Sequence, residues 1–197
     1  MKKICALIAI LSGLSASAGA TPVLLGEITH DYGSAAGKLD PSGTDLLSAD
    51  YVTVTDSSNV RFSDAFNFSA FNFTSIEHFE LTLNFSQTNG FNFIFPEAWH
   101  VRPGNSLTEL PLNRVGDTVT SQTFSFGPSV DTFALSIAAE KFDLWFADEG
   151  VGANNFRLYD AKLTVFGEAA AVPEPSSLAL VGLGVVALAG LRRRRKA

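Results

Sequence analysis

Hydrophobic and polar side chains alternate along several separate runs between Thr21 and Gly167. A period of two places successive residues on opposite faces of a strand and is typical of a half-buried β-sheet. The clearest run carries Phe79, Leu81, Leu83 and Phe85 on one side and polar residues between them. The same pattern recurs at residues 51–55, 91–95, 133–137, 142–146 and 163–165. These runs predict strands, with Leu81 in the core.

Turn signals divide the runs and predict how they connect. Asn89-Gly90 stands between the run ending at Phe85 and the run around residues 91–95, which predicts a hairpin. No segment of residues 21–167 shows helical periodicity. About eight strands, joined by loops rich in Gly, Asn, Asp and Ser, predict an all-β fold: a single antiparallel β-sandwich or jelly-roll-like domain over residues 21–167.

The first twenty residues have the order of a secretory signal peptide. Lys2 and Lys3 give a positive start, residues 4–14 are apolar, and small residues follow up to Ala20. The apolar part is too short for a membrane anchor. Residues 1–20 are therefore predicted to be removed after export, with the Sec machinery and signal peptidase as partners.

The other end has three parts in a fixed order. Residues 168–177 form a linker that contains a Pro-Glu-Pro triplet, residues 178–191 are apolar, and residues 192–197 are mostly basic. The apolar part would be about 21 Å long as a helix, and snorkelling arginines can make up the difference to the bilayer core. We expect one short transmembrane helix at 178–191 and a cytoplasmic basic tail at 192–197, because positive residues stay inside.

This ordered tail resembles the sorting signal of the PEP-CTERM family, with Pro173, Glu174 and Pro175 as the sorting motif. The resemblance covers about the last 25 residues. It implies recognition by an exosortase, a membrane transpeptidase with a catalytic cysteine, and removal of the hydrophobic tail near the motif. A plain tail anchor with a proline-rich hinge is the alternative.

Phe62, Asp64 and Phe66 form the pattern F-x-D-x-F, which resembles a subgroup of the same family. At alternate positions of one strand, the three side chains share a face. Asp64 is therefore expected at the apolar side or its rim, where a carboxylate needs hydrogen-bond partners such as the N–H groups of a neighbouring loop. The alternative is that Asp64 is a ligand for a cation.

Composition narrows the classes of partner. Residues 21–172 contain seven basic and nineteen acidic side chains, a net charge of −12. Such a surface repels phosphate backbones, which argues against a nucleic-acid partner. The single cysteine, Cys5, lies in the predicted signal peptide, so we expect neither a disulfide nor a thiolate site in the mature protein.

Candidate chemistry is sparse. His30, His78 and His100 lack the spacing of a metal site, and we predict no catalytic residue and no resident metal. A calcium candidate is the oxygen-rich stretch from Asp143 to Asn155, although its spacing is not that of an EF-hand. A sugar-stacking platform is conceivable if three large aromatic residues are exposed, although packing in the core or at its rim is the favoured interpretation. The three are Trp99, Trp145 and Tyr159.

These observations predict a non-enzymatic, exported protein of the cell surface or extracellular matrix of an exopolysaccharide-producing bacterium. It would be held transiently in the inner membrane and would have a structural or adhesive role in a biofilm, with extracellular polysaccharide as a possible contact. Two alternatives stay open: a carbohydrate-binding module, and a glycan-acting hydrolase with an unrecognised acidic site.

Overall fold

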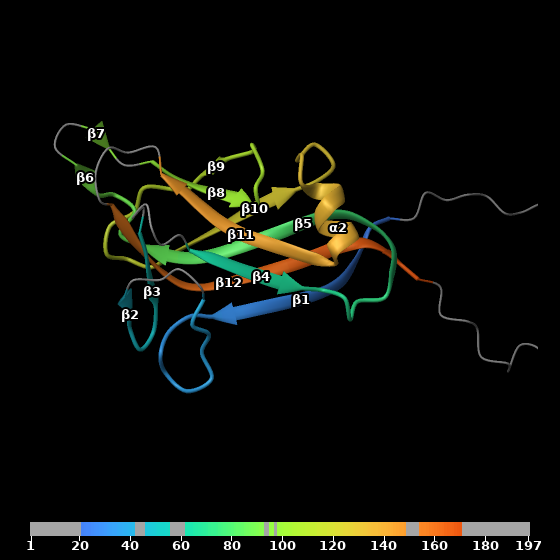
Figure 1. Cartoon of the computed structure of the whole chain (residues 1–197), viewed down its shortest axis with the longest axis horizontal. Helices are drawn as coiled ribbons and strands as arrows, with labels where there is room; N and C mark the ends of the chain where they lie inside the picture. The colour runs from blue at the N-terminus through green and yellow to red at the C-terminus, as the bar shows by residue number, and fades with distance from the viewer. Residues whose placement is uncertain are drawn as a thin grey trace, which may run out of the picture.

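The structure is a computed structural model in which two β-sheets pack face to face (Figure 1). It describes residues 21–41, 46–55, 62–92, 95–96, 98–148 and 154–170. The strand pairings within the sheets are antiparallel. The predicted all-β class is confirmed, and a sandwich fits the arrangement.

The larger sheet has six strands and is built on two long ones. Its order is β10-β5-β12-β3-β2, and β1 pairs with the remaining length of β12. Its strands are β1 (Val23–Asp31), β2 (Leu46–Leu47), β3 (Val52–Thr55), β5 (Phe73–Ser86), β10 (Thr120–Phe126) and β12 (Asn155–Ala169).

The smaller sheet has four strands in the order β4-β11-β8-β9. Its strands are β4 (Ser63–Asn67), β8 (Trp99–Pro103), β9 (Leu110–Pro111) and β11 (Lys141–Asp148). A separate two-stranded sheet consists of β6 (Phe91–Asn92) and β7 (Phe95–Pro96), and one short helix, α2 (Phe133–Ala139), precedes β11.

The core lies between the two sheets and is rich in aromatic rings. Phe79 of β5 meets Phe142 of β11 at 5.4 Å between ring centroids, and Phe156 of β12 meets Trp99 of β8 at 4.8 Å. Leu81, at the centre of β5, is fully buried. Every second residue of the run 79–85 is buried, as the alternation predicts. Burial of these side chains is the main force that holds the sheets together.

The predicted hairpin at Asn89-Gly90 is wrong. β5 pairs with β10 and β12, and β6 pairs with β7. The chain leaves the sheet at Gln87, whose φ of 61° turns the backbone away. The N–H groups of Gln87 and Asn89 then donate to the carbonyls of residues 116 and 115. Pairing between distant segments therefore takes the place of the local hairpin.

The run at residues 133–137 is helical, which corrects both the predicted strand there and the expectation that the domain contains no helix. Phe133 is buried and Ile137 packs against the core, whereas Leu135 is 69% exposed. Phe133 and Ile137 are one helical turn apart, and three alanines in the segment favour a helix. The spacing of two was a coincidence of a short segment.

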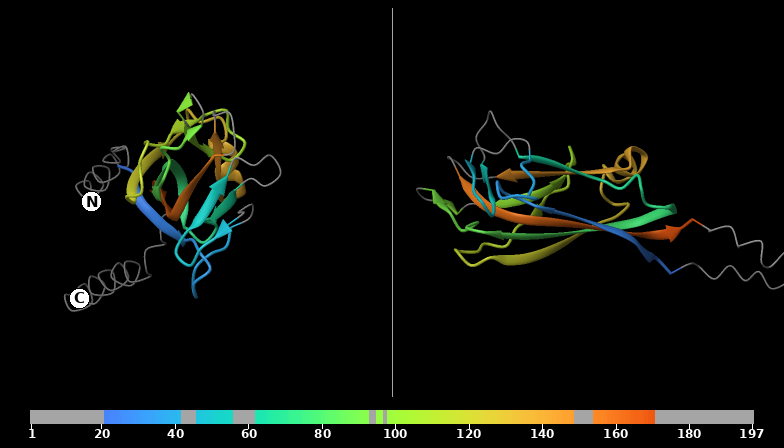
Figure 2. Two further views of the ribbon diagram at one scale, coloured as in Figure 1. Left: turned by 90° about the vertical axis from the view of Figure 1, so that its left-hand side faces the viewer. Right: turned by 90° about the horizontal axis from the view of Figure 1, so that it is seen from below.

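Both ends of the domain emerge from the same end of the sandwich (Figure 2). Val23 at the start of β1 pairs with Gly167 near the end of β12, and β12 continues to Ala169, two residues past the expected boundary. The predicted signal peptide, sorting triplet, apolar segment and basic tail lie outside the described residues. In the part of the chain that the structure describes, no helix is long and apolar enough to cross a membrane.

Candidate functional site

The F-x-D-x-F motif enters β4 with its three named side chains turned inward. Phe62 is 2% exposed, Asp64 9% and Phe66 0%. Ala65 and Asn67 of the same strand are exposed. The predicted common face of the motif is therefore confirmed, and it brings a carboxylate to the edge of the hydrophobic core.

Asp64 is held by side chains from the end of β1 and the residue that follows it. Its Oδ2 accepts hydrogen bonds from Nδ1 of His30 at 2.7 Å and from the hydroxyl of Tyr32 at 2.5 Å. Its Oδ1 accepts the N–H of Ala65 at 2.7 Å. The predicted partners were N–H groups of a neighbouring loop. The structure supplies mainly side-chain donors from the other sheet.

Electrostatics favour the ionised form of Asp64. Burial disfavours the charge, but the hydrogen bonds from His30, Tyr32 and the Ala65 N–H outweigh it, so that the pKa of Asp64 lies below its usual value. For Tyr32, burial and the nearby Asp64 charge raise the pKa well above its usual range. At neutral pH Tyr32 is therefore a hydroxyl donor and Asp64 an acceptor.

The aromatic residues of the motif complete the same cluster. The His30 ring stacks on Phe66 with centroids 4.3 Å apart, and Tyr32 meets the edge of Phe62 at 5.7 Å. Each inward side chain of F-x-D-x-F thus contacts His30 or Tyr32. His30 and Tyr32 stand two apart in the sequence, a spacing that places both side chains on one face of an extended segment and so was a local signal for their shared position.

This cluster closes one side of the sandwich. β1 lies at an edge of the larger sheet and β4 at an edge of the smaller one, and the Asp64 bonds cross between them. On the opposite side, Gln122 of β10 bridges to the backbone of Pro111 and Asn113, at and just beyond β9. A polar side chain therefore joins the two sheets at each side. The Asp64 bonds satisfy polar groups that are buried or partly buried, whereas the Gln122 bonds are exposed.

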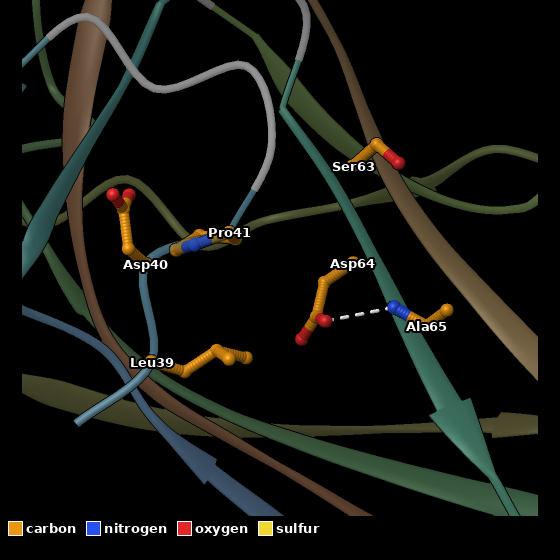
Figure 3. A pocket seen from close by; sticks show the side chains of 6 residues that line it. All are labelled: Leu39, Asp40, Pro41, Ser63, Asp64 and Ala65. Atoms are coloured by element: carbon orange, nitrogen blue, oxygen red, sulfur yellow. Dashed lines mark hydrogen bonds between the residues drawn. The ribbon is translucent and has the colours of Figure 1, made fainter. Parts of the chain in front are cut away.

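Two hollows flank the cluster. One, of about 290 Å³, is lined by Asp64 and its neighbours in β4 on one side and by residues 39–41 on the other (Figure 3). The second, of about 240 Å³, lies beside His30 and Lys38. Leu39 borders both, and in Figure 3 its side chain points towards Asp64. Both volumes fall below the range of ordinary small-molecule clefts.

The Asp64–His30 pair resembles the Asp–His pair of a hydrolytic site, but Asp64 also binds a second side chain. The oxygen that orients His30 also accepts the hydroxyl of Tyr32, a fully buried residue. All three partners of Asp64 donate hydrogen bonds to it, so the carboxylate is satisfied by hydrogen bonds alone. A bound cation would need further oxygen ligands beside the carboxylate. The geometry can fix two strands together and keep the carboxylate ionised.

The other candidates lie apart from this cluster. Trp99 is buried in the core, Trp145 is half-buried in the smaller sheet and Tyr159 is half-buried in the larger one, so these three do not form a common platform. Asp143 pairs with Lys141 at 3.0 Å. The oxygen-rich stretch that it begins runs through residues 149–153, outside the described residues. Among the described residues, no group of three or more acidic, histidine or cysteine side chains could hold a metal ion.

A half-buried aromatic pair is formed by Tyr51, which precedes β3, and Tyr159 of β12. The rings of Tyr51 and Tyr159 are 5.4 Å apart, and the guanidinium of Arg157 lies 4.8 Å from the centre of the Tyr51 ring. Tyr159 was a candidate for sugar stacking from the sequence, whereas Tyr51 and Arg157 are brought to it by the fold, and together they combine an apolar ring surface with a cation.

Comparison with known families identifies the C-terminal segment. Residues 171–195 match the PEP-CTERM protein-sorting motif, which includes the Pro173–Pro175 triplet. No curated protein and no solved structure matches the chain. The matched motif is that of an exported protein which an exosortase targets to the cell surface.

Proposed function

We propose that the β-sandwich acts outside the cell as a non-enzymatic structural or adhesive protein of an exopolysaccharide-rich envelope or matrix. In this proposal an exosortase recognises the triplet Pro173, Glu174 and Pro175 and removes the apolar tail. The observation that carries the proposal is the sorting motif at residues 171–195, which is separated from the last strand of the domain by a single residue.

The spacing between strand and motif supports this order of events. Eight residues, 170–177, separate the end of β12 from the apolar segment. Fully extended, they reach at most about 28 Å. The end of the sandwich where β12 ends would therefore stay near the membrane while the tail is embedded, and a cut near residues 173–175 leaves every strand of the domain intact.

The role of Asp64 supports a non-enzymatic function. It is the carboxylate of the F-x-D-x-F motif, and its contacts join the two sheets. Its lowered pKa keeps it charged at neutral pH, and hydrogen bonds from His30, Tyr32 and the Ala65 N–H within the protein satisfy that charge. These properties fit a structural clasp, by which we mean the hydrogen bonds of Asp64 to His30 and Tyr32 that hold the two sheets together.

The sorting step is tested in the native host with Pro173, Glu174 and Pro175 all replaced by alanine. We expect the variant to stay in the membrane fraction at the size of the unprocessed precursor, while the wild-type protein reaches the surface or medium at a smaller size. Replacement of Ser176 and Ser177 by alanine is the matched control and should leave processing unchanged. Normal processing of the triple variant, or of the wild type in a strain without exosortase, would rule out the exosortase step.

A carbohydrate-binding role is the second candidate, and the Tyr51–Tyr159 pair favours it. The accessible parts of these half-buried rings can stack on a sugar ring, and the tyrosine hydroxyls and the Arg157 guanidinium can bond to its hydroxyls. The test is binding of the purified protein to a glycan array and to the exopolysaccharide of its host. Tyr51→Ala should lose binding at least tenfold, whereas Trp145→Ala, at a half-buried aromatic of the other sheet, should not.

A further inference from the structure

The edges of the two sheets differ in how they are protected against pairing with another chain. β2 and β9 have only two residues each, and β9 includes Pro111. β4 is five residues long and turns the charged Asp64 inward. β1 has an irregular register next to Gly26, against which the ring of Phe71 lies, and it carries Glu27 and Asp31. Short length, proline, inward charge and bulges are the usual devices that prevent edge-to-edge association.

β10 is the one edge strand of the described sheets with none of these devices. It spans seven residues, Thr120–Phe126, and its register with β5 is continuous. The chain from Thr118 to Val130 carries no charged side chain for 13 residues, although the domain as a whole is strongly acidic. Within the described residues, β5 is the only strand that pairs with β10.

We infer that the free edge of β10 is a docking surface for the β10 strand of a second copy of this chain. Two copies of this domain, each with a net charge of −12 over residues 21–172, repel one another at most approaches, and the uncharged edge is where that repulsion is weakest. In Figure 2 (right), β10 forms the lower border of the molecule, away from the β11 layer.

The sequence of β10 also suits pairing with itself. In an antiparallel pair centred on Thr123, each Thr123 stands opposite the other, and Ser121 of one copy stands opposite Ser125 of the other. Ser121, Thr123 and Ser125 are exposed, whereas Phe124 and Phe126 are buried in their own core. The two larger sheets then form one continuous sheet across the dimer. Threonine and serine pairs across strands are favourable.

The test uses cysteine cross-linking of the full chain in intact cells, with Cys5→Ala to remove the native thiol. Thr123→Cys places two thiols directly opposite each other, at a separation that a disulfide can bridge. Thr29→Cys is the matched control, because Thr29 is an exposed threonine on β1, at a different edge of the same sheet. We expect a reducible dimer for Thr123→Cys and none for Thr29→Cys.

The register gives a second, independent readout. Ser121→Cys alone should not cross-link, whereas Ser121→Cys combined with Ser125→Cys should. Thr123→Lys places like charges opposite each other and should halve the mass measured by light scattering of the purified protein. A wild-type mass of one chain, or equal cross-linking of Thr29→Cys and Thr123→Cys, would overturn the inference. Neither result bears on the sorting step, which is tested by processing alone.

Discussion

Replacement of Asp64 tests whether the F-x-D-x-F motif is a structural clasp. Asp64→Ala leaves the hydroxyl of Tyr32 without its acceptor in a residue with no solvent exposure. An unsatisfied buried donor costs about 1–3 kcal/mol. The His30 side chain is 22% exposed and can bond to water instead, so the loss of its hydrogen bond to Asp64 adds only about 1 kcal/mol.

The total destabilisation expected for Asp64→Ala is about 2–4 kcal/mol, or a fall in Tm of roughly 5–15 °C for a domain of this size. Asp64→Asn keeps an oxygen that accepts the Ala65 N–H, and its amide can donate to a flipped His30 tautomer or to the Tyr32 oxygen. We expect that variant to lose about half as much. Thermal unfolding followed by circular dichroism measures both.

Tyr32→Phe shows whether the destabilisation of Asp64→Ala comes from the lost hydrogen bond or from lost packing. In the wild type it removes a hydrogen bond to a carboxylate and should cost about 1.5–3 kcal/mol. In the Asp64→Ala background the hydroxyl is already unsatisfied, so the same change should be neutral or stabilising. Equal costs in the two backgrounds would show that the hydroxyl and Asp64 are not coupled, and would refute the reasoning.

Two conditions sharpen the result. Because the pKa of Asp64 is lowered in the folded state, its stabilisation is present above the unfolded pKa of about 3.9 and is lost as the pH falls through the lower folded value. The difference in Tm between wild type and Asp64→Asn should therefore shrink in strong acid. A chelator should leave the wild-type Tm unchanged. A fall in Tm that is absent from Asp64→Ala would instead identify a cation at this residue.

Further predictions concern the core, the sheet surface and the end of the domain. Leu81→Ala should cost about 2–5 kcal/mol in denaturant unfolding, because Leu81 is fully buried; a cost below about 0.5 kcal/mol would contradict the core position. Asp31→Asn should stabilise the protein by about 0.2–1 kcal/mol at pH 7, because Asp31 lies opposite Asp160, whose pKa is raised by burial and by the Asp31 charge. That gain should disappear in acid, where Asp160 is protonated, and a gain that persists there would have another cause. A fragment of residues 21–170 should be more stable than residues 21–167 by about 1–3 kcal/mol, since the shorter one loses the last pairs of β12 with β5; equal Tm values would show that these pairs do not contribute.

Local patterns in the sequence were sufficient to predict a feature where that feature depends on neighbouring residues alone. The alternation of residues 79–85 predicted which side chains are buried, because a strand between two sheets must place every second residue in the core. The order of triplet, apolar segment and basic cluster identified the sorting motif, because that motif is defined by the order of residues along a short segment.

Where a short segment fits more than one local structure, its contacts with the rest of the molecule decide which structure it adopts. Residues 133–137 have the alternation of a strand. One turn of helix, however, places Phe133 and Ile137 on the same side, where both pack against the core. Asn89-Gly90 is a good turn sequence, yet β10 and β12 take both sides of β5, which leaves no free edge for a local hairpin.

The sequence by itself determined that the chain is exported, that its middle is a β-domain, and that Asp64 faces inward with two phenylalanines. Only the tertiary structure decided what Asp64 bonds to and which strand edge is left unprotected. His30 and Tyr32 lie more than thirty residues from Asp64 along the chain, and their meeting depends on how the two sheets stack. Periodicity reports the face on which a side chain lies, but strand order is set by pairing and packing between distant segments.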